Sequence, residues 1–238
     1  MVIYIYNFNL RIGVVVINVE KKMKKNNDIN IYKLVWVFVI ASFIGWAMEL
    51  VWFVIKWGEF VYNQGLVWGP FQQIYGFGAV IITLLAAMLK EKKNITIFIF
   101  GFVAFGLFEH FSGLFLEVFT NTYAWDYSRV GYNFIIGKYV YLPYCLAWGL
   151  FALVWTKKIH GHIMEKLNKL NAPKFNLFTI FVIIFFVINL LFTGYATDRL
   201  VKRSQGIVAN NNFSKMIDNL FDDDYMKKWL PKVRILPN

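Results

Sequence analysis

The sequence predicts an all-α protein of the polytopic membrane class, a bundle of about five transmembrane helices. Of its 238 residues, 58% are hydrophobic, and the mean hydropathy is +0.50. Several apolar runs reach about 20 residues, the length that a helix needs to cross the hydrocarbon core of a bilayer. The five predicted spans are 31–56, 71–89, 95–118, 137–156 and 175–197.

Basic residues gather beside alternate ends of these spans and predict an orientation. One side carries Lys21, Lys22, Lys24, Lys25, Lys33, Lys90, Lys92, Lys93, Lys157, Lys158, Lys166, Lys169 and Lys174. The opposite connections carry Lys56, Arg129 and Lys138. By the positive-inside rule, this asymmetry predicts a plasma-membrane protein with its amino terminus in the cytoplasm. The net charge of +11 then reflects topology, and no nucleic-acid partner is expected.

One conflict concerns the carboxyl terminus. Five spans place it outside, whereas Arg199, Lys202 and Arg203 directly follow the fifth span and favour the inside. A re-entrant stretch at 57–70, or a span in the opening segment, would resolve the conflict.

The predicted organisation has three parts: a cytoplasmic extension at 1–30, the transmembrane bundle at 31–197, and a polar tail at 198–238. Residues 1–22 are either an extension or no part of the native protein, because Met23 offers a second start. Within 159–170, apolar residues at helical spacing alternate with lysines, which predicts an amphipathic helix on the inner leaflet. The tail carries a second such stripe, formed by Phe213, Met216, Ile217 and Leu220.

Three glutamates, Glu49, Glu109 and Glu117, lie inside predicted spans. A charged side chain at the bilayer centre costs roughly 2.5 kcal/mol or more, so such residues face protein or a water-filled cavity. Helical spacing places each glutamate on a stripe with small residues, which let helices approach closely. We therefore expect the two stripes to pack together around a carboxylate-lined cavity that opens outward. The stripes are Ser42, Gly45, Glu49, Trp52 and Lys56 on the first span, and Gly106, Glu109, Gly113 and Glu117 on the third.

Other interpretations of these residues stay open. A protonated glutamate can serve only to hold two helices together, and Glu117 is near enough to the interface to be hydrated. His110 beside Glu109 suggests a metal, but adjacent helical residues point to different faces. We predict no metal, no cofactor and no catalytic residue, because the serine elbow, the phosphate-binding loop and zinc-ligand spacing are missing from the sequence. The chain alone is therefore not expected to hydrolyse ATP.

Several segments in a fixed order resemble one family of bacterial membrane proteins. They are 42–49, 63–70, 74–78, 109–117, 125–128, Asn133, Gly137 and 148–149. Over roughly 34–158, the chain is similar to the family named putative ABC-transporter type IV permeases. The resemblance implies a permease that works with a separate ATPase subunit, and it supplies no substrate. Gln64, Gln73 and Lys138 replace residues that are often Arg, Pro and Arg in the family, and the first change removes an external cation.

The favoured hypothesis is a transport component, with the basic stretch 157–174 contacting an ATPase and a homo-oligomer completing the path through the lipid bilayer. The predicted substrate- or ion-binding residues are Glu49, Glu109, Glu117, Gln72, Gln73, Asp126 and Asn133. Two alternatives remain: a non-catalytic membrane scaffold, and an enzyme acting on lipid or envelope precursors at the outer leaflet. In the enzyme, Glu109 or Asp126 would be the acid or base.

Overall fold

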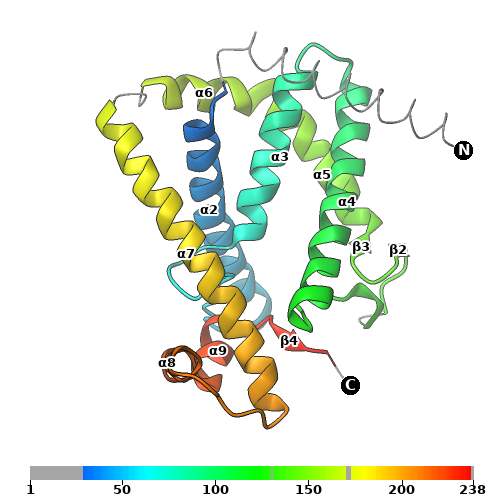
Figure 1. Ribbon diagram of the computed structural model, residues 1–238. Coiled ribbons are helices and arrows are strands. Elements are labelled where there is room, and N and C mark those ends of the chain that lie inside the picture. The colour runs from blue at the N-terminus through cyan, green and yellow to red at the C-terminus, as the bar shows by residue number, and fades with distance from the viewer. Residues whose placement is uncertain (1–28, 130, 170–172, 237–238) are drawn as a thin grey trace, which may run out of the picture.

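The computed structural model describes residues 29–129, 131–169 and 173–236. Predictions about the opening segment therefore lie almost entirely outside the described residues. Helices dominate, which confirms the all-α prediction (Figure 1). They are α2 (Ile31–Trp57), α3 (Gln73–Leu89), α4 (Asn94–Thr120), α5 (Leu142–Val154), α6 (His160–Lys169), α7 (Pro173–Ser204), α8 (Asn212–Leu220) and α9 (Asp223–Trp229).

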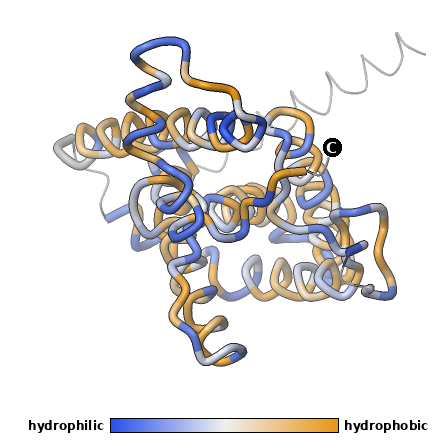
Figure 2. Tube along the Cα trace, turned by 90° about the horizontal axis from the view of Figure 1, so that it is seen from below, coloured by the Kyte–Doolittle hydropathy of each residue, from blue (hydrophilic) through white to orange (hydrophobic). Residues whose placement is uncertain are grey.

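By length and composition, three helices of the described chain can cross a membrane: α2, α4 and the Asn176–Ser204 part of α7. Helix α3 is apolar but has 17 residues. Helix α5 has 13 residues and continues through a π-helical turn (Trp155–Ile159) into α6. The long helices leave large apolar side chains uncovered, including Ile55 of α2, Phe115 of α4 and Leu191 of α7. Apolar residues predominate along the helices (Figure 2), as a lipid environment requires.

Two predicted boundaries are wrong. The span expected at 137–156 begins as a helix only at Leu142, because the preceding residues form a hairpin of β2 (Ile135–Ile136) and β3 (Val140–Tyr141). Gly137 has a φ of 62° in the turn of this hairpin, a conformation that suits glycine. The last span, expected to end at 197, continues as α7 to Ser204.

The basic amphipathic helix predicted at 159–170 exists as α6, which lies across the end of the bundle that carries the α3–α4 connection (Figure 1). We call this the lysine-rich end. Met164 and Leu167 are buried against Val37 of α2 and Ala79 of α3. The apolar face of α6 therefore packs at least in part on the protein itself, and its position at the inner leaflet stays a prediction.

The two glutamate-bearing stripes do not pack against each other, so that prediction is wrong. The strongest helix pairings are α2 with α3 and α4 with α5, and α3 lies between α2 and α4 (Figure 1). Gly45 of α2 faces the ring of Tyr75 on α3, so closely that a Cβ there would clash with it. On α4, Gly113 faces the ring of Tyr139 in the same way. Periodicity identified the close-packing faces of both helices but not their neighbours.

Residues 63–72 form a buried loop between α2 and α3, and helix α7 holds its backbone. Val67 N–H donates to Thr193 Oγ1 at 3.0 Å. The Asn189 amide accepts from Trp68 N–H at 3.2 Å and donates to Trp68 C=O at 2.7 Å. Non-helical backbone is tolerated at membrane depth only where such partners satisfy it. Asn189 and Thr193 thus bind this buried loop rather than another helix.

The tail folds across the opposite end of the bundle, which we call the tail end (Figure 1). The tail buries Ile217 of α8, Phe221 between the two helices and Met226 of α9 against Val67 and Ala196. The last strand, β4 (Arg234–Ile235), pairs antiparallel with β1 (Thr122–Tyr123), which follows α4. The tail therefore connects α7, the buried loop and the α4 side of the molecule.

Candidate functional site

Glu49 lies on α2 where α3 and the buried loop meet, and three neutral side chains donate hydrogen bonds to its carboxylate. Tyr75 OH donates to Oε1 at 3.1 Å. Gln72 Nε2 donates to Oε2 at 3.3 Å, and Asn63 Nδ2 makes a short bond to the same oxygen. These donors supply the protein partners that a carboxylate on a membrane-spanning helix requires.

A fourth partner of Glu49 comes from the tail. Lys232 Nζ lies 2.6 Å from Glu49 Oε2, and the two residues are 183 positions apart in the chain. The Glu49 side chain is 13% exposed and that of Lys232 is 41% exposed. The same ammonium lies 5.7 Å from the centre of the Phe53 ring, within cation–π range. Glu49 is therefore a largely buried carboxylate that holds a partly exposed cation.

The buried loop positions the two amide donors. Gln72 N–H donates to Ser42 C=O on α2 at 2.9 Å, and Gln72 Nε2 also donates to Asn63 C=O at 3.0 Å. Asn63 is 1% exposed, and its Oδ1 is buried without a hydrogen-bond partner. Gly65 leaves room for the side-chain oxygens of Gln72 and Gln73, which a Cβ would displace. Gln73 Oε1 is likewise buried and unpartnered.

Glu109 lies on α4 among aromatic residues, and its Oε2 is buried without a hydrogen-bond partner. Trp148 of α5 and Tyr75 of α3 lie close enough to interact with its carboxyl group. Tyr75 thus donates to Glu49 and lies within electrostatic range of Glu109.

Glu117 and Asp126 belong to the β2–β3 hairpin region and not to the Glu49 site. Glu117 pairs with Lys138 at 2.7 Å and accepts a short hydrogen bond from Tyr139 OH. Asp126 Oδ1 accepts from Ser128 N–H at 3.0 Å, and Asp126 Oδ2 pairs with Arg129 at 3.0 Å. Burial alone would raise the pKa of the Asp126 carboxyl, but the bonds from Ser128 and Arg129 outweigh it and lower that pKa. The contacts of Glu117 and those of Asp126 therefore each stabilise a turn of the chain.

Of the predicted site residues, Glu49 and Gln72 meet directly, and Gln73 lies beside them at Gly65. Asn133 is exposed in the bend before β2. The residues that sequence reasoning missed are Asn63, Tyr75 and Lys232. Asn63 and Tyr75 lie in segments that carry the family resemblance, which is a usable signal. Lys232 has no such signal.

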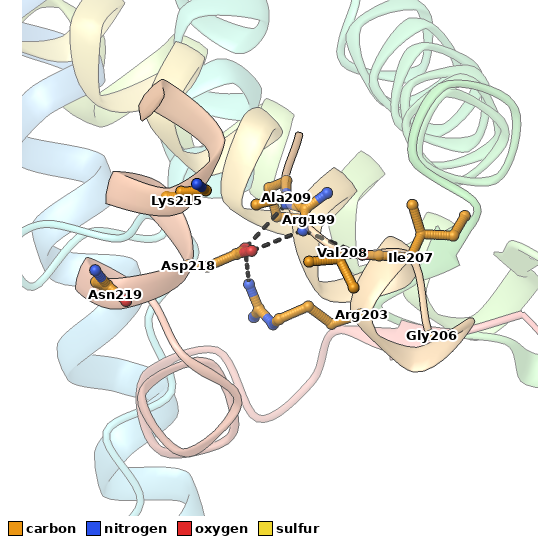
Figure 3. A pocket seen from close by; sticks show the side chains of 9 residues that line it. All are labelled: Arg199, Arg203, Gly206, Ile207, Val208, Ala209, Lys215, Asp218 and Asn219. Atoms are coloured by element: carbon orange, nitrogen blue, oxygen red, sulfur yellow. Dashed lines mark hydrogen bonds and ion pairs between the residues drawn. The ribbon is translucent and has the colours of Figure 1, made fainter. Parts of the chain in front are cut away.

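The tail end also contains a hollow of about 410 Å³ beside α7 and α8. Asp218 lies between Arg199 and Arg203, with N–O separations of 2.7 and 2.6 Å (Figure 3). The Arg199 hydrogen bond, with smaller help from Arg203, lowers the pKa of the Asp218 carboxyl. Because these three groups form ion pairs with one another, we interpret them as the contact that holds the tail on α7.

Comparison with known proteins adds one match. The model of the family described as putative ABC-transporter type IV matches residues 36–194. The chain belongs to this family. The matched range contains the buried loop and three of the Glu49 partners, whereas Lys232 lies beyond it. No curated protein and no solved structure matches the chain. Family membership and the apolar helices together make this a membrane protein related to transport.

Proposed function

We propose that this chain is the membrane-spanning component of an ABC-type transport system, with the Glu49 site as its substrate- or ion-binding site. The observation that carries the proposal is the convergence of Asn63, Gln72, Tyr75 and Lys232 on one carboxylate. Such intramembrane ionisable residues mark substrate and ion pathways. Family membership supplies the transport context.

The orientation that fits this function places the lysine-rich end in the cytoplasm and the tail end outside. The first connections carry the basic residues, and the first helices to insert usually dominate topology. The Glu49 site then opens outward, at the end where external substrate arrives. Arg199 and Arg203, which favoured an inside tail, are held in ion pairs with Asp218.

The ATPase partner docks on the lysine-rich end in this proposal. Lys157 Nζ donates to the backbone carbonyls of Lys90 and Lys92, at 3.0 and 3.2 Å, and so fixes the α3–α4 connection against the end of α5. Lys92 and Lys93 are exposed there. Because a single bundle of this size is small for a substrate path, two copies assemble to complete it.

Co-purification from native membranes tests the proposal. The tagged full-length chain should bring down an ATPase subunit, identified by mass spectrometry and by ATP hydrolysis. Replacing Lys92 and Lys93 by Glu should release it, because charge reversal disrupts a complementary interface. A matched double replacement of Lys227 and Lys228 by Glu, at the tail end, should leave it bound. Absence of an ATPase from every preparation would overturn the proposal.

One observation favours a second candidate, a non-catalytic scaffold. Glu49 already has four partners, as a carboxylate that only fastens helices and loop would have. The scaffold needs no ATPase, so the same co-purification separates the two functions.

A further inference from the structure

The Glu49 site is occupied by the chain's own Lys232, a residue on a short terminal segment. We propose that this ammonium is a tethered competitor, and that the Glu49 site binds small organic primary ammonium ions that displace it. This inference rests on the proposed function, since it names the substrate class and the regulation of the same site.

The chemistry of the site suits a primary ammonium. Lys232 presents three N–H donors, and Glu49 Oε2 accepts at 2.6 Å while the Phe53 ring lies 5.7 Å away. Asn63 Oδ1 is a buried acceptor that the lysine leaves unpartnered. A free amine is not held by a chain, so its remaining N–H groups can take orientations that the tethered lysine cannot adopt. A quaternary ammonium has no N–H to donate and would leave these acceptors unsatisfied.

The segment that bears Lys232 can leave while the rest of the tail stays docked. We call residues 231–236 the strap. Among the described residues, its contacts are the Glu49 ion pair and the adjacent Phe53 ring, the packing of Val233 on the tail core, the two-residue β4–β1 ladder, and the bond from Leu236 N–H to Asn121 C=O. The preceding helices have their own anchors: Asp218 to Arg199 and Arg203, and Tyr225 OH to Val67 C=O at 2.6 Å. The strap therefore opens from the end of α9 onward.

A tethered competitor sets the concentration that an external ligand must reach. A group on a short linker competes at an effective concentration in the millimolar range. The apparent dissociation constant equals the intrinsic constant divided by the fraction of sites that the strap leaves open. Removing the lysine should therefore tighten amine binding by about fivefold or more.

Calorimetric titration of the full chain in lipid nanodiscs measures this effect, with propylammonium chloride as the probe. Lys232→Met should bind the probe at least about fivefold more tightly than the natural chain. Lys227→Met, on an exposed lysine of the same tail, should match the natural chain. Adding Glu49→Gln to Lys232→Met should remove the gain, and tetramethylammonium should not bind. A smaller gain, or a gain that survives Glu49→Gln, would overturn the inference.

A second variant guards against failure of Lys232→Met to fold. Tyr123 and Arg234 are Cα partners across β1 and β4, so Tyr123→Cys with Arg234→Cys should lock the strap when oxidised. Oxidation should weaken propylammonium binding by about fivefold or more and reduction should restore it. Equal affinity in both states would refute the tethered competitor. These titrations need no ATPase, so this inference and the proposed function can fail separately.

Discussion

Glu49 and Glu109 are two membrane carboxylates on either side of α3, and their surroundings differ. Glu49 has four donors, drawn from a loop, a helix and the tail. Glu109 has one oxygen with no partner and lies among aromatic rings. A buried carboxylate is stabilised where donors satisfy its oxygens and is destabilised where an oxygen is left without a partner. The two residues, which look alike in the sequence, therefore have different chemistry.

The largest expected effect is on the free energy of unfolding, and it should distinguish Glu49 from Glu109 directly. Replacing Glu49 by Leu leaves Lys232 without its counter-ion and three neutral donors without an acceptor, a loss of about 3 kcal/mol or more in the free energy of unfolding. Replacing Glu109 by Gln removes a group that has an unsatisfied oxygen, so it should cost under about 1 kcal/mol. Reversible unfolding of both variants in the same detergent measures the difference.

A similar loss for both variants would contradict the comparison, because Glu109 would then have partners equal to those of Glu49. Glu91→Gln, in the exposed α3–α4 connection, is the matched control and should leave stability within about 0.5 kcal/mol.

The sequence predicts the two glutamates but only part of their surroundings. Apolar runs locate α2 and α4 within a few residues, because length and hydropathy are local properties. Periodicity also marks Gly45 and Gly113 as close-packing positions, since small residues permit close approach. It does not say that their neighbours are Tyr75 and Tyr139, because the choice of partner is a property of the whole fold.

The predictions that failed did so for the same reason: they depend on contacts that are properties of the whole fold. The composition predicts a helix that begins at Gly137, but the β2–β3 hairpin occupies the first residues of that run. Lys232 reaches Glu49 across 183 positions, and a contact of that range follows from tail docking, which has no local signature. The packing of α6 on Val37 and Ala79 is likewise invisible in its amphipathic pattern, because lipid and protein both accept an apolar face.

A smaller effect should come from the loop that positions the Glu49 donors. Asn189→Leu leaves the N–H and C=O of Trp68 without the amide that pairs with both. Each buried unsatisfied group costs about 1–3 kcal/mol, and water entry relieves part of it, so we expect a total of about 2 kcal/mol. Thr197→Val loses only a bond to its own helix and should cost less than half as much. Unfolding of both variants provides the test.

Hydrogen exchange locates where the Asn189→Leu loss acts. Protection should fall in the buried loop and in α9, which binds it through Trp229 C=O and Gln64 N–H. It should be unchanged in α5, next to Glu109. Loss of protection spread evenly over both regions would show that the loop is not a separate support for Glu49.

The smallest effect should be the pH dependence of the tail anchor, formed by Asp218, Arg199 and Arg203. This anchor lies at the tail end, away from Glu49 itself. Because Arg199 and Arg203 lower the pKa of Asp218, this carboxylate contributes its full stability above the unfolded pKa of about 3.9. The contribution is lost as the pH falls from there through the lowered folded pKa. Its side chain is 17% exposed, so solvent screens part of the interaction and we expect a loss of about 1 kcal/mol. The protection of the α8 amides, corrected for the intrinsic exchange rate at each pH, should therefore fall as the pH drops below about 3.9. Asp218→Asn should show the faster exchange already at neutral pH and little further change, whereas Asp224→Asn, on an exposed residue of α9, should follow the natural chain. If Asp218→Asn kept the acid transition, another group would anchor the tail, and the ion pairs at α7 would not explain why the tail stays docked when the strap opens.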